Sequence, residues 1–65
     1  MLIREALKRA RERKGLRQSE LAEKLYVDKS LVCRWEKGQR RISLDELTVI
    51  LEILGITIDE FKKMC

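Results

Sequence analysis

Three glycines and no proline divide this chain into short segments that end at Gly15, Gly38 and Gly55. Glycine readily adopts the left-handed conformation that commonly follows a helix, so each glycine is the expected residue just beyond a helix C-terminus. Apolar residues between these points recur at spacings of three and four, the period of an amphipathic helix. No run alternates with period two for long enough to predict a strand. We therefore expect an all-α fold.

Capping signals mark where five helices begin and end. Asp28 is the expected N-cap of the third helix, and Ser43-Leu44-Asp45-Glu46 and Thr57-Ile58-Asp59-Glu60 both fit the capping-box pattern. The expected helices span residues 2–14, 18–25, 29–37, a fourth segment from the first capping box through residue 54, and a short final segment after the second box. Because 65 residues suffice for one small core only, residues 1–65 are expected to form one domain.

The residue types that are missing exclude several classes of function. The chain contains no histidine and only two cysteines, Cys33 and Cys65, so imidazole catalysis, histidine-ligated zinc and a cysteine-only zinc site are not expected. No glycine-rich phosphate loop occurs, and no apolar run approaches the roughly 18 residues of a membrane span. The composition predicts a cytoplasmic protein that is not an enzyme and has no cofactor, no metal and no membrane partner.

The charges are distributed unevenly along the chain. Residues 1–41 hold 13 Lys and Arg against 6 Asp and Glu, a net charge of +7, whereas residues 42–65 hold 2 against 5, a net charge of −3. A basic surface attracts polyanions, above all nucleic acids. A basic amphipathic helix can also bind a membrane surface or a calmodulin-like groove, so charge alone leaves the partner open.

The expected helix 29–37 has two chemically different faces. Its apolar face holds Leu31, Val32 and Trp35, and we expect the tryptophan to pack in the core. Its polar face lacks acidic residues and holds Lys29, Ser30, Cys33, Arg34 and Lys37. Such side chains can reach base edges in the DNA major groove, where arginine pairs bidentately with guanine. Because charged helix faces are usually only solvated, the neighbouring sequence has to decide between these interpretations.

Residues 18–36 read QSELAEKLYVDKSLVCRWE. The pattern Gln-x-x-Leu-Ala, then Val, then Trp-Glu-x-Gly resembles the helix-turn-helix of the Cro and lambda-repressor class, the xenobiotic-response-element (XRE) family. The resemblance extends from LKRARERKGL in the first helix to the LGITIDEF ending. It implies a five-helix lambda-repressor-like fold whose second and third helices form the helix-turn-helix, with the third helix in the major groove.

The resemblance also implies roles for individual residues. The base-reading positions fall on Lys29, Ser30 and Arg34, with Cys33 beside them. The phosphate-contacting positions fall on Arg17, Gln18, Ser19, Lys37, Gln39, Arg40 and Arg41. Arg11 and Glu36 fall on paired positions that link the first helix to the end of the third, and we expect a partly buried ion pair there.

Both ends of the second helix depart from the family pattern. Arg17 stands where Ser or Thr usually caps the helix, and a missing cap costs about 0.5–2 kcal/mol. Tyr26 stands at a turn position that is often glycine, and a left-handed backbone there would cost a tyrosine roughly 1–2 kcal/mol. These departures predict a locally weaker fit to the family fold.

The fourth helix carries apolar residues on two sides. On a helical wheel, one ordinary core stripe is formed by Leu44, Leu47, Ile50, Leu51 and Leu54. Val49 and Ile53 fall on the opposite side, and the apolar residues that follow are too numerous for one small core. Because a contiguous apolar patch marks an interface, we expect a homodimer built by Val49, Ile53, Ile56, Ile58 and Phe61.

Together these features predict a sequence-specific DNA-binding transcriptional regulator, repressor-like, that binds a roughly two-fold operator in double-stranded DNA as a homodimer. The alternative is an antitoxin or protein-interaction adaptor. In that case the acidic C-terminal third would bind a regulatory partner protein, and DNA binding would be secondary.

Overall fold

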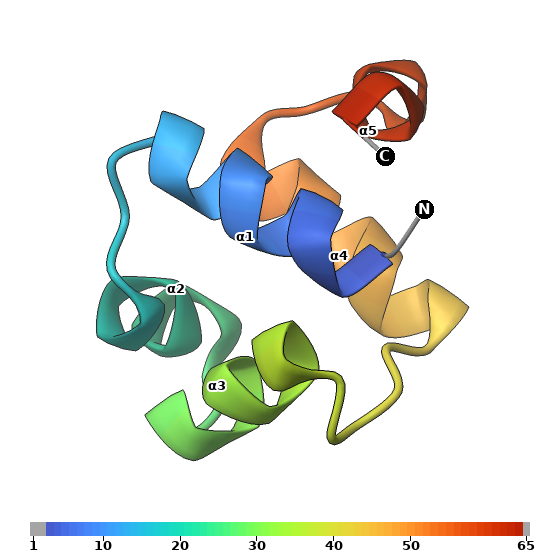
Figure 1. Ribbon diagram of the computed structural model, residues 1–65. Helices are drawn as coiled ribbons and strands as arrows, with labels where there is room; N and C mark the ends of the chain where they lie inside the picture. The colour runs from blue at the N-terminus through green and yellow to red at the C-terminus, as the bar shows by residue number, and fades with distance from the viewer. Residues whose placement is uncertain (1–2, 65) are drawn as a thin grey trace.

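The computed structural model describes residues 3–64, which form helices joined by short loops, with no strand in that range. In chain order the helices are α1 (Ile3–Arg13), α2 (Gln18–Leu25), α3 (Lys29–Lys37), α4 (Leu44–Leu54) and α5 (Ile58–Met64), and Figure 1 shows how they are arranged. The expected all-α, five-helix architecture is confirmed. The first helix ends one residue earlier than expected, and its expected first residue, Leu2, lies outside the described residues, as does Cys65.

The predicted glycine positions do end helices. Gly15, Gly38 and Gly55 all have positive φ angles, between 68° and 75°, and follow α1, α3 and α4. At the start of α4, the Glu46 amide donates to Ser43 Oγ at 3.1 Å, and the Ser43 amide donates to Glu46 Oε1 at 2.9 Å. This completes the predicted capping box and fixes where the loop after α3 turns into α4.

The start of α3 is capped less completely than the sequence indicated, and the start of α2 is capped more completely. Asp28 occupies the N-cap position of α3, but its side chain accepts no capping hydrogen bond, and only its carbonyl accepts one, from the Leu31 amide at 3.0 Å. At α2, the Arg17 amide donates to Glu20 Oε1 at 2.9 Å. One half of a capping box therefore forms although the N-cap residue is an arginine.

The turn between α2 and α3 contains the one positive-φ residue other than glycine in residues 3–64. Tyr26 has φ 58° and ψ 41°, the left-handed conformation that its position implied. Its side chain is 96% exposed, so no packing contact offsets the backbone cost. The turn therefore carries a strain of roughly 1–2 kcal/mol that a glycine would avoid.

A single apolar cluster joins all five helices. α1 packs against α3 and α5, and α2 packs against α3 and α4. The buried members of the cluster are Ala6, Leu7, Ala10, Leu21, Ala22, Val32, Trp35, Leu47, Ile50, Leu51, Leu54, Ile56, Phe61 and Met64. Small Ala22 lies where α2 meets its neighbours, which lets the helices approach closely.

Two expectations about the C-terminal apolar residues are wrong. Leu44, expected in the core stripe of α4, is 75% exposed because it is the first residue of the helix and nothing covers it. Ile56 and Phe61, expected at an interface, are buried at 7% and 2% exposure. α5 folds back against α1 and brings these side chains into the core of the same chain, so the core holds more residues than expected.

Residues 3–64 contain neither a membrane-spanning helix nor a cluster of metal-binding side chains. No helix there has the length and apolar character needed to cross a membrane. No cluster of three or more His, Cys, Asp or Glu side chains is placed to hold a metal ion.

Candidate nucleic-acid interface

Helix α3 presents the predicted base-reading residues on its outer face. Val32 and Trp35 are buried and fix the inner face of the helix against the core. Lys29, Ser30 and Arg34 are exposed on the other side, and Cys33 beside them is half-buried. The structure thus brings the predicted base-reading residues together on one helix, with its rotation set by the two buried side chains.

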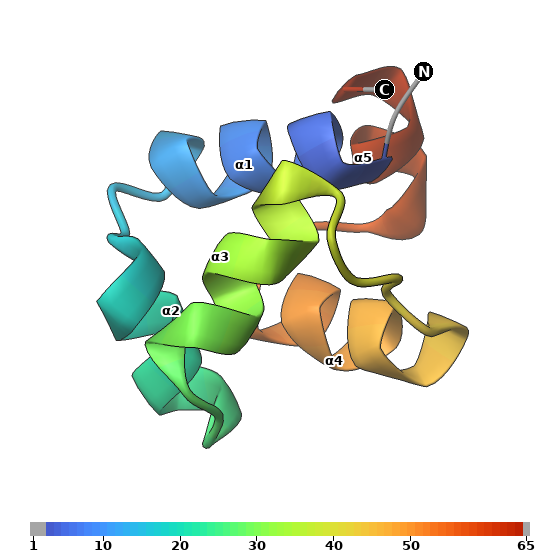
Figure 2. The same cartoon turned by 60° about the horizontal axis from the view of Figure 1, so that its bottom comes forward.

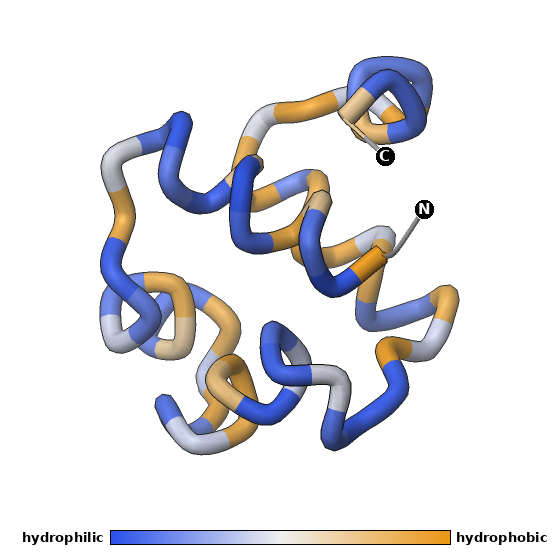
Figure 3. Tube along the Cα trace, in the orientation of Figure 1, coloured by the Kyte–Doolittle hydropathy of each residue, from blue (hydrophilic) through white to orange (hydrophobic). Residues whose placement is uncertain are grey.

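The predicted phosphate-contacting residues lie on both sides of this helix. Figure 2 shows α3 at the front of the molecule, with α2 on one side and the loop that leads to α4 on the other. Arg17 is exposed at the start of α2, and Lys37 is exposed at the end of α3. Figure 3 shows the loop after α3 as a hydrophilic stretch before the mostly hydrophobic α4; its exposed members are Gln39, Arg40 and Arg41.

Arg11 and Glu36 form the expected ion pair between α1 and α3. Arg11 Nε lies 2.7 Å from Glu36 Oε2, and Nη2 donates to Oε1 at 3.0 Å, which makes the pair bidentate. Arg11 Nη1 also donates to the Leu16 carbonyl at 2.7 Å, which ties the α1–α2 loop to the same group. Only 10% of the Arg11 side chain and 4% of the Glu36 side chain are exposed.

This ion pair changes the ionisation of the arginine in a direction that favours the pair. The hydrogen bond with Glu36 raises the pKa of Arg11 above its ordinary value, although partial burial opposes the shift. A raised pKa in the folded state means that the stabilisation is fully present below the ordinary pKa and is lost only above it. The Arg11 contribution therefore persists through neutral and moderately alkaline pH.

Gln18 is part of the same polar network, a contact that the sequence did not reveal. Gln18 Nε2 donates to Glu36 Oε1 at 3.0 Å, so the first residue of α2 is connected to the end of α3. One of the two amide protons of this predicted phosphate-contacting residue is therefore already used. Glu36 accepts three hydrogen bonds and is turned inward, which removes its negative charge from the exposed side of α3.

The remaining residues of the predicted dimer interface lie in two separate places. Val49 on α4 is 47% exposed, and Ile53, one turn later, is half-buried against the core. Ile58 is also 47% exposed, but it lines a different, largely apolar groove of about 330 Å³. Leu44 and Leu51 line the same groove, whereas Val49 and Ile53 do not.

Comparison with known proteins finds a matching family and a similar protein. The model of the family described as Helix-turn-helix matches residues 7–61, which include all of α2 and α3. The chain is similar to the HTH-type transcriptional activator BcrR of Enterococcus faecalis, with 37% identity over 60 residues. The match covers 92% of this chain but 29% of BcrR, so the chain spans less than a third of that relative's length. No solved structure gave a significant match.

Proposed function

The chain belongs to the XRE-type helix-turn-helix family, and from this premise we propose that it is a sequence-specific DNA-binding regulator of transcription. The observation that carries the proposal is the arrangement of α3. Buried Val32 and Trp35 hold one face of the helix against the core, while the opposite face is basic and exposed. A helix supported in this way can enter a major groove without any change in the protein.

In the proposed complex, base readout and positioning are divided between different elements. Lys29, Ser30 and Arg34 on α3 contact base edges, with the half-buried Cys33 as a small neighbour. Gln18 holds Glu36 with one amide proton and offers the other to a phosphate. The remaining phosphate contacts come from the two sides of α3, from Arg17, Ser19, Lys37, Gln39, Arg40 and Arg41.

The salt dependence of binding to random duplex DNA tests this proposal. With six or more phosphate contacts, affinity should fall about 10³-fold or more between roughly 50 and 200 mM salt. Lys62→Gln is a matched control, because it removes one exposed positive charge from α5 and leaves α2, α3 and the following loop intact. Absence of binding at low salt would favour the alternative function, an antitoxin or adaptor that acts through a regulatory partner protein.

We also propose that the regulator acts as a homodimer on a roughly two-fold operator. Val49 and Ile53 lie one turn apart on the same face of α4, and they form the proposed centre of the interface. Ile58 is assigned to the rim, because it lines a separate groove. Ile56 and Phe61 are excluded from the contact surface, because they are buried in one chain. The two α3 helices would then lie about 34 Å apart, one turn of DNA.

Sedimentation equilibrium with operator titration tests the interface. The double substitution Val49→Glu with Ile53→Lys should abolish both dimerisation and cooperative operator binding. The matched pair Leu44→Glu with Thr48→Lys places the same charges at the same spacing on the groove side of α4 and should leave the dimer intact. If the second pair dissociates the protein and the first does not, the interface lies on the groove side of α4.

The proposal also covers the kind of protein unit and the direction of regulation. Residues 1–65 act as one non-enzymatic, cytoplasmic helix-turn-helix unit. The sequence predicted a repressor-like role, whereas the relative is named as an activator, and the repressor role stays a prediction. A reporter fused to a promoter that carries selected binding sites distinguishes the two directions.

A further inference from the structure

A cleft of about 390 Å³ lies where the first turn of α1, the end of α3 and the loop before α4 meet. Its walls are formed by Ile3, Arg4, Trp35, Gly38, Arg40, Arg41 and Ile42. Pockets that bind small molecules have volumes of this order, with mostly apolar walls and a few polar groups that fix orientation. The composition of the walls therefore indicates what the cleft could hold.

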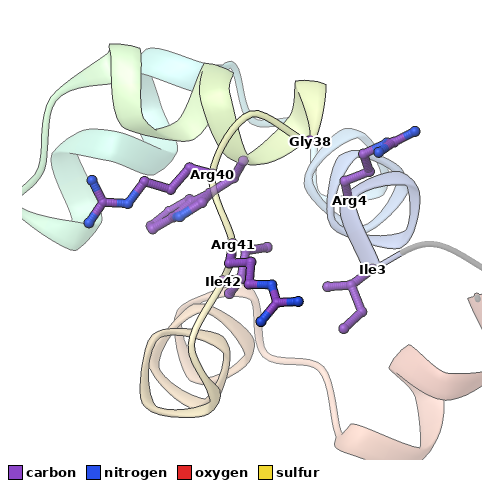
Figure 4. Close-up of a pocket in the computed structure, with 7 residues that line it drawn as sticks. Ile3, Arg4, Gly38, Arg40, Arg41 and Ile42 are labelled. Carbon is purple, nitrogen blue, oxygen red and sulfur yellow. The ribbon is translucent and has the colours of Figure 1, made fainter.

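The charges around the cleft are all of one sign. Three of its lining residues are arginines and none is acidic, and no ion pair to any of the three is found among residues 3–64. Figure 4 shows Arg40 and Arg41 extending to opposite sides of the loop, with Arg41 directed toward Ile3, whereas Arg4 lies beside Gly38 and extends away from Arg41. Arg4 and Arg41 thus line the cleft from different elements, and neither is ion-paired among residues 3–64.

Trp35 in the wall of the cleft carries a further donor without a partner, its indole N–H. Trp35 is 98% buried, yet its indole Nε1 has no hydrogen-bond partner. Buried tryptophan N–H groups usually find an acceptor, and leaving one unpaired is unfavourable. Gly38 also lines the cleft. The Arg4 side chain fills the space that a Cβ at this position would occupy, so only a glycine fits there without displacing Arg4.

We propose that this cleft is a binding site for a small organic anion. The charged head, a phosphate or carboxylate, contacts the guanidinium groups of Arg4 and Arg41, which suit oxyanions in geometry and charge. The apolar body lies against Ile3, Ile42 and the Trp35 ring. The Trp35 N–H is itself buried and takes no part in this contact.

The site is distinct from the proposed DNA interface in what it recognises, although two residues that line the cleft, Arg40 and Arg41, belong to both. Of these two, Arg41 is the one that we assign both to the bound anion and to DNA phosphates. If both assignments hold, a bound anion competes with the DNA backbone for this guanidinium. This competition rests on the proposed function, whereas binding of the anion itself does not.

The chain has one tryptophan, so its indole N–H gives a single NMR resonance that reports directly on the cleft. Phenyl phosphate is the probe, because it combines an oxyanion with a compact apolar ring. Titration should shift the indole resonance saturably. Inorganic phosphate, which lacks the ring, and benzylamine, which carries the opposite charge, should bind at least about tenfold more weakly.

Substitutions at the rim test the assignment of the charged head. Arg4→Gln and Arg41→Gln should each weaken phenyl phosphate binding about tenfold or more. Arg13→Gln removes the same charge at the other end of α1 and should leave binding unchanged. Circular dichroism melting of each variant verifies that the fold persists.

Two results would overturn the proposal. One is the absence of any saturable indole shift up to roughly 10 mM phenyl phosphate. The other is an equal loss of binding in all three arginine variants, which would indicate a general charge effect. If Arg41→Gln weakens duplex DNA binding in a protein that does not bind phenyl phosphate, the cleft is no small-molecule site and Arg41 serves the DNA backbone. Failure to bind DNA would refute the proposed function and leave the indole titration fully interpretable.

Discussion

All five helices share one apolar core, but the N-terminal part of the molecule, α1 to α3, adds a polar network to it, whereas the C-terminal part, α4 and α5, relies mainly on apolar packing. In the first part, a buried polar network of Arg11, Glu36 and Gln18 connects three helices with defined hydrogen bonds. In the second part, apolar side chains such as Ile50, Leu54 and Phe61 do most of the packing. A hydrogen bond requires one particular partner atom in one geometry, whereas an apolar side chain requires only that other apolar atoms cover it.

This difference determines what sets the stability cost of a substitution in each part. Removing a member of the polar network leaves a buried charge without its partner, so the cost depends on electrostatics. Removing a core side chain leaves a cavity, so the cost depends on volume. Two predictions separate the two kinds of stabilisation, and two more concern the exposed basic residues and a backbone conformation that occurs in both parts.

The largest effect is expected at Phe61 in the C-terminal part. Phe61→Ala should lower the free energy of unfolding by about 3–5 kcal/mol, because the ring is almost completely buried between α5 and α1. Urea denaturation followed by circular dichroism measures the loss. Such a loss can unfold a domain this small, so Phe61→Leu, which keeps much of the volume, should show a smaller, measurable decrease.

Leu44→Ala is the matched control for Phe61. Leu44 is 75% exposed, so its truncation should change the free energy of unfolding by no more than about 0.5 kcal/mol. If Phe61→Ala were as mild as Leu44→Ala, α5 would not be docked on α1, and the original expectation of an interface at Phe61 would return.

The next effect is expected in the polar network of the N-terminal part. Glu36→Gln should lower the free energy of unfolding by about 1.5–3 kcal/mol, because Arg11 loses its charged partner while the side chain keeps its shape. Glu23→Gln on the exposed side of α2 removes the same charge and should be nearly neutral. Equal melting temperatures for the wild type and Glu36→Gln would show that the ion pair does not stabilise the fold.

The contrast between the two parts also explains which features were predictable from the sequence. The ends of α3 and the Ser43 capping box depend on local chemistry within a few residues, so the pattern located them correctly. The contact between Gln18 and Glu36 depends on how two helices cross, and no local pattern encodes that crossing.

The wrong expectations arose in the apolar part for a related reason. A helical wheel places Leu44 and Leu51 on the same side of α4, but it does not reveal that no neighbouring element covers the first turn of the helix, where Leu44 is exposed. The same limit applies to Phe61, whose burial depends on the turn that returns α5 to α1. Apolar periodicity identifies a face to be covered, and the tertiary fold decides what covers it.

The third prediction concerns the exposed basic residues of the proposed interface. Arg34→Ala should weaken binding to the selected operator by about 1–3 kcal/mol and relax the preference at one base pair, because Arg34 lies on the exposed face of α3. Arg41→Ala, in the loop, should weaken all duplexes nearly equally and lower the salt slope by about one. Competition titrations with single-base operator variants measure both effects. Unchanged base preference in Arg34→Ala would mean that another face of the helix reads the DNA.

The smallest changes in stability are expected at two residues, one in each part of the molecule, that share the same left-handed backbone conformation. Tyr26 after α2 and Gly55 after α4 both adopt left-handed φ angles, 58° and 68°, and neither is crowded: the tyrosine is 96% exposed, and a Cβ at Gly55 would meet no atom within 4 Å. Tyr26→Gly removes a backbone strain of roughly 1–2 kcal/mol. The glycine also loses more conformational entropy on folding, which costs roughly 0.5–1 kcal/mol. We therefore expect the free energy of unfolding to rise by less than about 1 kcal/mol. Gly55→Ala reverses both terms and should cost a similar amount. Paired thermal melts measure the two changes, and because the conformation is the same, their signs must be opposite. A loss of stability in Tyr26→Gly would mean that the exposed ring stabilises the α2–α3 turn more than its backbone strain destabilises it.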